Sequence, residues 1–458
     1  MSPHSPQSPV PSPRGENAKP STEKGQELYR RAKKRIPGGT QLLSKRPEMF
    51  LPEQWPSYFS TARGVEVTDV DGNTYIDMSM MAIGACVLGY ADPDVDAAVK
   101  AAIDAGSAST LNAPEEVELA DLLCELHPWA EMVRFARAGG EAMMMAVRIA
   151  RARTRRDIVA FSGYHGWGDW YLAANLGDEH ALDGQLMPGL DPAGVPRGLK
   201  GTALPFHYNR FDELKAIVDA HRGELAAIVM EPRRGEAPDP GFLEAVRDIA
   251  TGIGAVLVFD EITTGFRMTD GGIHKLLGVD PDVAVFAKSM ANGYPMAAVI
   301  GRAGVMESAQ STFISSTNWT ERIGPVAALA TIRKLRRERV ADHLITIGNL
   351  TFDGWTRAAK KTGLPLQTEG LPSLAHFRFD HPDEPMLTTL FTQDMLERGY
   401  LAYSQFKPSF AHRPEHVAAY MTAVEAAFAT IADAIHAGDG ASRLNGPCAR
   451  RGFYRLTS

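Results

Sequence analysis

The feature that most constrains the fold is an alternation of apolar runs and amphipathic segments between about residues 82 and 320. Uninterrupted apolar runs alternating with amphipathic helices are typical of a parallel sheet covered on both faces. The sequence therefore predicts an α/β fold with a mostly parallel central sheet flanked by helices. The expected strands are Ile158–Phe161, Ala226–Met230, Ala255–Phe259 and Val283–Ala287, and the expected helices are Pro114–Leu126, Glu141–Arg153 and Gly241–Ile253.

The segments on either side of this region predict a smaller α+β domain. Residues 23–81 include a helix expected from about Thr22 to Arg35 and a hairpin around Asp71-Gly72, a pair suited to a tight type I′ turn. Residues 325–437 include a helix through Leu335, and then an expected strand and two helices: Ala375–Asp380, Pro385–Glu397 and Pro414–His436. We expect the large domain to span 82–324, with a disordered Pro/Ser-rich tail at 1–22 and a solvated tail at 438–458.

Composition excludes several classes of function. With 48 Lys+Arg against 55 Asp+Glu, the chain has no positive excess that would hold nucleic acid. No run approaches the roughly 20 apolar residues of a membrane helix, so we expect no membrane partner. Cys86, Cys124 and Cys448 are far apart and have no partners at metal-ligand spacing. We interpret them as reduced thiols of a cytoplasmic protein and expect no metal.

Two charged side chains stand where ligands collect in an open parallel sheet, beyond the carboxyl ends of the strands. Asp260 ends one apolar run and Lys288 follows the next, 28 residues later. One interpretation is that the two side chains simply form an ion pair. However, an amine at the partly desolvated rim of a sheet also has the environment of an imine-forming lysine, because burial depresses its pKa.

Two further motifs lie at expected strand ends. Gly139-Gly140 precedes a helix, where free backbone N–H groups and the helix dipole suit a phosphate, although a plain loop-to-helix turn has the same sequence. Tyr164-His165 follows the strand at Ile158–Phe161 and offers a ring on which a flat cofactor can stack. The alternatives are core packing for Tyr164 and a structural hydrogen bond for His165.

Taken together, these motifs resemble the class III aminotransferases of pyridoxal-phosphate (PLP) fold type I, in particular the glutamate-1-semialdehyde aminomutase-like branch. The most specific match is the run Asp-Glu-Ile-Thr-Thr-Gly-Phe-Arg from Asp260 to Arg267, behind an apolar strand. The similarity covers about residues 25–436. It also includes Ala138-Gly139-Gly140-Glu141-Ala142, Tyr164-His165-Gly166, Lys288 with Gly293-Tyr294-Pro295, Ile36-Pro37-Gly38-Gly39, the run from Asp71 to Asp77, and Ser404-Gln405-Phe406.

The resemblance implies a PLP enzyme in which Lys288 forms the Schiff base and later acts as the general base, while Asp260 keeps the ring nitrogen protonated. It further implies a homodimer with shared active sites, in which Thr317 reaches the cofactor phosphate of the neighbouring subunit. The implied cofactor contacts are Gly139, Gly140, Tyr164, His165, Asp260, Ile262, Lys288 and Thr317.

Departures from the family pattern lie in the expected pocket. Gly140 replaces a hydroxyl residue, and Lys407 stands in a region where the aminomutases carry a glutamate. Arg267, Arg322 and Lys407 are candidates for binding a substrate carboxylate, with a structural role as the alternative for the arginines.

Three functions remain open. The chain is expected to be an aminotransferase that moves an amino group from a small amino donor to a keto or aldehyde acceptor. The alternatives are an aminomutase, which transfers the group within one molecule, and a PLP-binding protein without turnover.

Overall fold

The computed structural model describes residues 21–185, 187–233, 235–450 and 452–453, which fall into two compact units. The first unit contains the described residues up to Met81 together with Ile345–Arg450, and the second contains Ala82–Leu344. The expected boundary at residue 325 is therefore too early, because helix α11 (Ile323–Arg337) packs against α3 and α4 of the second unit. The tail expected at 1–22 lies outside the described residues except for Ser21 and Thr22.

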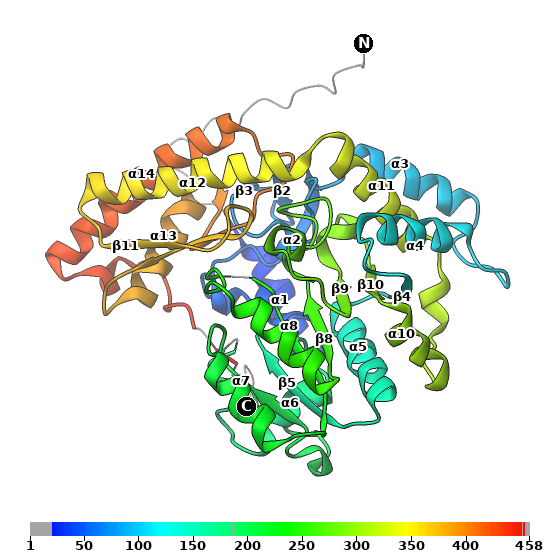
Figure 1. The fold of residues 1–458 in the computed structure, drawn as a ribbon. Coiled ribbons are helices and arrows are strands. Elements are labelled where there is room, and N and C mark those ends of the chain that lie inside the picture. Colours follow the sequence, from blue (N-terminus) through cyan, green and yellow to red (C-terminus); the bar gives the residue numbers. More distant parts are fainter. Residues whose placement is uncertain (1–20, 186, 234, 451, 454–458) are drawn as a thin grey trace. The chain divides into compact units, whose positions relative to one another are not determined.

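The second unit is built around a seven-stranded sheet in the order β4-β10-β9-β8-β7-β5-β6 (Figure 1). Neighbouring strands from β9 to β6 are parallel, and β10 alone runs in the opposite direction. This confirms the mostly parallel sheet. The strands are β4 (Met132–Ala136), β5 (Ile158–Ser162), β6 (Ala203–Pro205), β7 (Leu225–Met230), β8 (Val256–Asp260), β9 (Val283–Phe286) and β10 (Ala297–Gly301).

Helices cover both faces of this sheet. Successive strand residues point to opposite sides, so each strand contributes apolar side chains to two separate cores. Phe161, Val229 and Val258 join the core that contains α5 (Gly139–Thr154). Their neighbours Ala160, Ile228 and Leu257 join the core that contains α8 (Phe242–Ile253). The other helices of the unit are α3 (Pro93–Asp104), α4 (Pro114–Leu126), α6 (Asp169–Leu172), α7 (Phe211–Ala220), α9 (His274–Leu277) and α10 (Ala303–Met306).

The first unit combines two small sheets with long helices, as expected for an α+β domain. One sheet has the order β1-β2-β3-β13 and the other β11-β12-β14. The predicted hairpin joins β2 and β3, but its turn is not of type I′, because only Gly72 has a positive φ (89°) and residues 70–73 lie between the strands. The strands are β1 (Phe59–Arg63), β2 (Glu66–Asp69), β3 (Thr74–Asp77), β11 (Leu366–Glu369), β12 (Ala375–Phe379), β13 (Tyr400–Leu401) and β14 (Gln405–Phe406).

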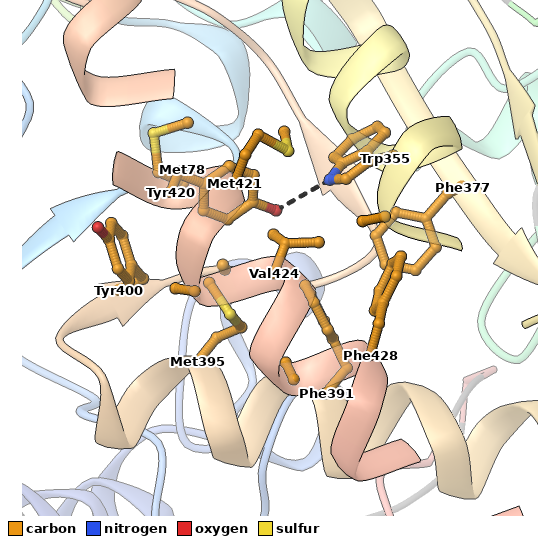
Figure 2. Packing of buried hydrophobic residues seen from close by; sticks show 14 of the residues in the cluster. Met78, Trp355, Phe377, Phe391, Met395, Tyr400, Tyr420, Met421, Val424 and Phe428 are labelled. Atoms are coloured by element: carbon orange, nitrogen blue, oxygen red, sulfur yellow. Dashed lines mark hydrogen bonds between the residues drawn. The ribbon is translucent and has the colours of Figure 1, made fainter. Parts of the chain in front are cut away.

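An aromatic core holds the first unit together (Figure 2). Phe428 of α14 lies with its ring centroid within 5.8 Å of those of Phe377 and Phe391, and Trp355 Nε1 donates to the hydroxyl of Tyr420 at 3.2 Å. By length and composition α14 is one helix that could cross a membrane, but its side chains form part of this core. The helices are α1 (Glu23–Arg35), α13 (Glu384–Glu397) and α14 (Pro414–Ala437); α12 (Val340–Thr362) begins in the second unit and continues into the first.

The C-terminal segment is packed as far as residue 450, which corrects the expectation of a solvated tail from 438. Asn445 donates its backbone N–H to Gln393 of α13 at 2.7 Å, and Gln393 donates in turn to the carbonyl of Arg443 at 3.0 Å. These bonds attach the segment to the surface of α13.

Candidate active site

The carboxyl ends of β8 and β9 bring Asp260 and Lys288 to one edge of the sheet. Asp260 is the last residue of β8 and pairs in register with Val285, so Lys288 lies three positions further along the chain, just beyond the end of β9. The side chain of Asp260 is buried and that of Lys288 is half-buried. The predicted juxtaposition of acid and amine thus follows from strand register.

Asp260 is held from two sides. One carboxylate oxygen accepts the backbone N–H of Ile262 at 3.0 Å, and the other lies 2.8 Å from Nδ1 of His165. The second ring nitrogen of His165, Nε2, lies 3.0 Å from the carbonyl oxygen of Ser162. The two contacts fix the plane and position of the His165 ring, with Nδ1 facing the carboxylate of Asp260. His165 therefore acts through Asp260 rather than as a stacking ring.

Lys288 is aimed by the turn that follows Asp260. Its Nζ donates to Oγ1 of Thr263 at 2.9 Å, and its backbone has φ = 48°, a left-handed conformation that is uncommon for lysine. The acid and the amine are thus both attached to the short segment 260–264. Sequence reasoning missed Thr263, although it lies within the most specific motif.

A buried polar network lies behind this segment, beside Asp260. Glu261 accepts hydrogen bonds from Nδ1 of His274 at 2.8 Å and from Thr264 at 2.6 Å, and all three side chains are buried. Burial alone raises the pKa of the Glu261 carboxyl, but these donors outweigh it and hold the pKa below its usual range. Trp129 Nε1 lies 3.0 Å from Nε2 of His274, which extends the network to a second aromatic side chain.

The start of α5 offers free donors, as the Gly-Gly motif predicted. Glu141 accepts the backbone N–H groups of Arg137 and Ala138, both at 3.1 Å. Among the residues that the structure describes, no protein acceptor binds the N–H groups of Gly139, Gly140 and Glu141. A Cβ at Gly139 would come within 2.9 Å of Cδ1 of Ile262, so this turn lies directly against the segment that carries Asp260.

Tyr164 lies beside the same turn, between Gly163 and His165. Its ring packs edge-on against Tyr171, with centroids 5.8 Å apart, and its side chain is half-buried. This contact agrees with the interpretation of Tyr164 as a core residue. Its contact with a cofactor stays a prediction.

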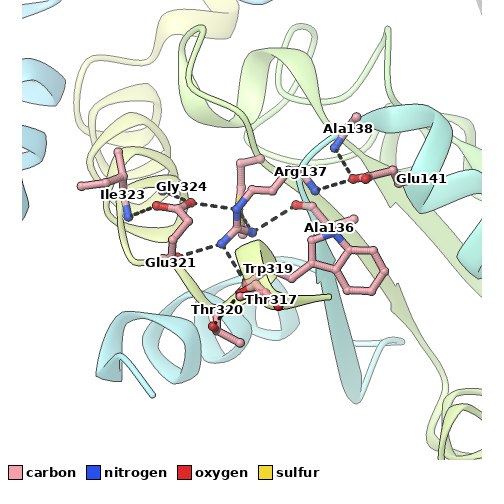
Figure 3. A network of polar contacts seen from close by, with 11 residues as sticks. Ala136, Arg137, Ala138, Glu141, Thr317, Trp319, Thr320, Glu321, Ile323 and Gly324 are labelled. Atoms are coloured by element: carbon pink, nitrogen blue, oxygen red, sulfur yellow. Dashed lines mark hydrogen bonds and ion pairs between the residues drawn. The ribbon is translucent and has the colours of Figure 1, made fainter. Parts of the chain in front are cut away.

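Arg137 ties the start of α5 to the segment that contains Thr317 (Figure 3). Its Nε donates to Glu321 at 2.7 Å, and its Nη2 donates to the carbonyls of Trp319 and Glu321, both at 2.8 Å. Glu321 in turn accepts the first backbone N–H groups of α11, from Ile323 and Gly324. The Arg137–Glu321 clamp therefore fixes the segment 317–322, in which Thr317 itself is exposed.

The candidate carboxylate-binding residues are differently placed. The guanidinium of Arg267 is buried and donates to the carbonyl of Gly84, and its burial lowers the pKa to about 10, which supports the bracing role. Arg322 is ion-paired with Glu115, so a substrate would have to compete with that carboxylate. Lys407 belongs to the first unit, where its backbone N–H donates to Ser79, and its substrate role stays a prediction.

Comparison with known proteins yields one consistent group. The sequence family described as aminotransferase class-III matches residues 52–424. The 3-aminobutyryl-CoA aminotransferase of Cloacimonas acidaminovorans (strain Evry) is 33% identical over 410 residues, which cover 85% of this chain and 94% of that protein. The glutamate-1-semialdehyde 2,1-aminomutase of Roseiflexus castenholzii is 35% identical over 413 residues, covering 85% and 92%. The PLP-bound FumI protein of Sphingopyxis sp. MTA144 superposes with a TM-score of 0.82 at 26% identity, covering 90% of this chain and 98% of that one.

Proposed function

This chain belongs to the class III aminotransferases, which use PLP, and from that premise we propose an intermolecular aminotransferase in which Lys288 holds the cofactor. It moves an amino group from a small amino compound to a keto or aldehyde acceptor. One observation carries the assignment of residues: Asp260 ends β8, Lys288 follows the end of the adjacent parallel strand β9, and Thr263, three residues after the acid, accepts a hydrogen bond from the amine.

The residues present fit each part of PLP. The unpaired N–H groups at Gly139 and Gly140 would form a cradle for its phosphate, and at Gly139 a side chain larger than hydrogen would collide with Ile262. The buried carboxylate of Asp260 suits a protonated ring nitrogen, and the Lys288 amine suits the aldehyde carbon. Ile262 would lie against the ring, and Tyr164 would stand beside it.

When bound, PLP accepts the electrons released as the substrate loses its Cα proton. Asp260 would hold the proton on the ring nitrogen, and His165, whose Nδ1 lies 2.8 Å from the carboxylate, would keep Asp260 oriented. The Lys288 amine would act as the base that takes the proton from the substrate Cα and, once protonated, as the acid that gives it back, with Thr263 orienting its Nζ.

The aminomutase is the second candidate, because relatives with that name match the chain over a similar length. Single-turnover mixing of the PLP-loaded protein with an amino donor separates the two. An aminotransferase releases one equivalent of carbonyl product and retains the amino group on the cofactor, whereas an aminomutase returns the nitrogen to the same carbon skeleton. The donor panel should include β-amino acids, since one relative is named for a β-amino thioester.

The active form is proposed to be a cytoplasmic homodimer with shared active sites. Thr317 is exposed, and Phe313, four residues earlier, leaves 85% of its surface in contact with solvent, which supports a partner surface here. The three cysteines are free thiols, as suits a reducing compartment. Light scattering of the wild type and Phe313→Asp tests the dimer: the variant should shift towards monomer and retain less PLP.

A further inference from the structure

The first turn of α5 lacks a side chain at the position nearest the proposed phosphate, and an indole stands in its place. Gly140 has no Cβ, and a Cβ built there would lie 3.2 Å from Nε1 and 3.4 Å from Cδ1 of Trp167. The polar edge of this tryptophan therefore occupies the space into which a side chain at position 140 would extend.

The backbone brings Trp167 to this place by close contacts that only glycine permits. Gly166 has φ = 96°, and a Cβ on it would come within 3.1 Å of the Cα of Gly140. Gly168 lies equally close to α5, since its Cβ would be 2.8 Å from Cγ of Met144. With a glycine on each side, Trp167 is held against the helix start rather than carried on a free loop.

The indole N–H of Trp167 is available for a ligand. Among the described residues no acceptor binds its Nε1. The side chain is 68% exposed, which is unusual for tryptophan, the largest aromatic side chain. An indole nitrogen can only donate a hydrogen bond. Its neighbours at the helix start, the N–H groups of Gly139 and Gly140, are also unpaired donors, so all of these groups suit one anion.

We propose that Trp167 Nε1–H donates a hydrogen bond to the phosphate of PLP and supplies the donor that Gly140 lacks. The inference rests on the proposed function, in that PLP must bind at the start of α5. A phosphate has three peripheral oxygens and more acceptor sites than the backbone N–H groups of one helix turn satisfy, so a further donor at this point adds affinity. Trp167 is in this sense a binding residue for the phosphate and takes no part in proton transfer.

The test is the dissociation constant of PLP, and of pyridoxal, which lacks the phosphate, for the full-length apoprotein. Trp167→Phe keeps a ring and removes the donor, so it should weaken PLP binding about tenfold, equivalent to about 1.4 kcal/mol, and leave pyridoxal binding unchanged. Trp55→Phe is the matched control, because Trp55 lies in the first unit and its hydrogen bonds with Gln26 and Ser57 use its backbone carbonyl, which the substitution keeps. Its affinity for PLP should equal that of the wild type.

A second variant tests the donor itself. Gly140→Ser added to Trp167→Phe restores a hydroxyl where the indole N–H stood, and should recover most of the lost PLP affinity. Unchanged PLP binding in Trp167→Phe would overturn the inference. An equal loss of affinity for PLP and pyridoxal would also overturn it. So would a loss of PLP affinity that Gly140→Ser does not recover, because the ring rather than its N–H would then be needed. If the wild-type protein binds no PLP, the proposed function fails instead.

Discussion

Protonation of His127 should destabilise the second unit at mildly acidic pH. The ring of His127 is buried, and its Nδ1 donates to the carbonyl of Leu123 at 2.9 Å. Its Nε2 must then be the acceptor for the backbone N–H of Gly272, at 3.0 Å. A proton on Nε2 would turn this bond into a contact between two donors, and burial accordingly lowers the pKa of His127 from 6.5 to about 4.

The magnitude follows from linkage between protonation and folding. Because the pKa is lower in the folded than in the unfolded chain, the stabilisation is complete above pH 6.5 and is lost as the pH falls towards 4. Between pH 7 and pH 5 the loss from this one residue is about 2 kcal/mol. The loss of this hydrogen bond should also disturb the candidate active site, because Gly272 lies two residues before His274, which is hydrogen-bonded to Glu261.

The assay is urea unfolding of the wild type and His127→Gln at pH 7 and at pH 5. Glutamine can donate to Leu123 and accept from Gly272 at both pH values. The fall in unfolding free energy between pH 7 and pH 5 should therefore be about 2 kcal/mol smaller in the variant. An equal fall in both proteins would refute the reasoning, because the acid sensitivity would then arise from other groups.

Three other substitutions test the site and the cores. Asp260→Ala should retain PLP but lower kcat at least about 100-fold, and near-normal turnover would contradict the role of the acid. Arg137→Met should lower Tm and accelerate loss of PLP, because the segment 317–322 loses the Arg137–Glu321 clamp. Arg134→Met is the control: it loses one hydrogen bond to a backbone carbonyl and should change neither Tm nor PLP retention. Phe428→Ala should destabilise the first unit by about 3–5 kcal/mol, measured by thermal unfolding, and a loss below about 1 kcal/mol would show that the core closes around the gap.

Much of the second unit could be predicted because its strands are apolar on both faces. The runs at β5, β7, β8 and β9 contain no charged residue except Asp260, the last residue of β8, so the strands and the polar residues at or just beyond their ends could be located together. Strand β4 was missed for the opposite reason, because it carries Arg134. Strand β10 is as apolar as the strands that were found, and its antiparallel direction depends on its partners β4 and β9.

The boundary near residue 325 was wrong because the packing of α11 depends on contacts distant in sequence. The basic residues of α11 do not mark a unit boundary in the sequence. One of them, Lys334, lies 2.8 Å from Asp92, which is more than 240 residues earlier in the chain. The continuous helix α12 then passes from one unit into the other without a linker.

Within the site, sequence reasoning found residues at strand ends and missed those that hold them. Asp260 and Lys288 are visible because polar residues are rare at the end of an apolar run. The contacts of His274 with Glu261, and of Arg137 with Glu321, join residues 13 and 184 positions apart and have no local signature. The position of Trp167 beside Gly140 depends on two glycine contacts that are apparent only in three dimensions.

Identification of the lysine that binds PLP tests the central assignment most directly. The full-length protein is saturated with PLP, reduced with borohydride and digested, and the labelled peptide is sequenced by mass spectrometry. The reduced cofactor is expected on Lys288 in the wild type, and no label is expected in Lys288→Ala. A label on another lysine, or the same labelled peptide yield when Lys288 is absent, would contradict this assignment.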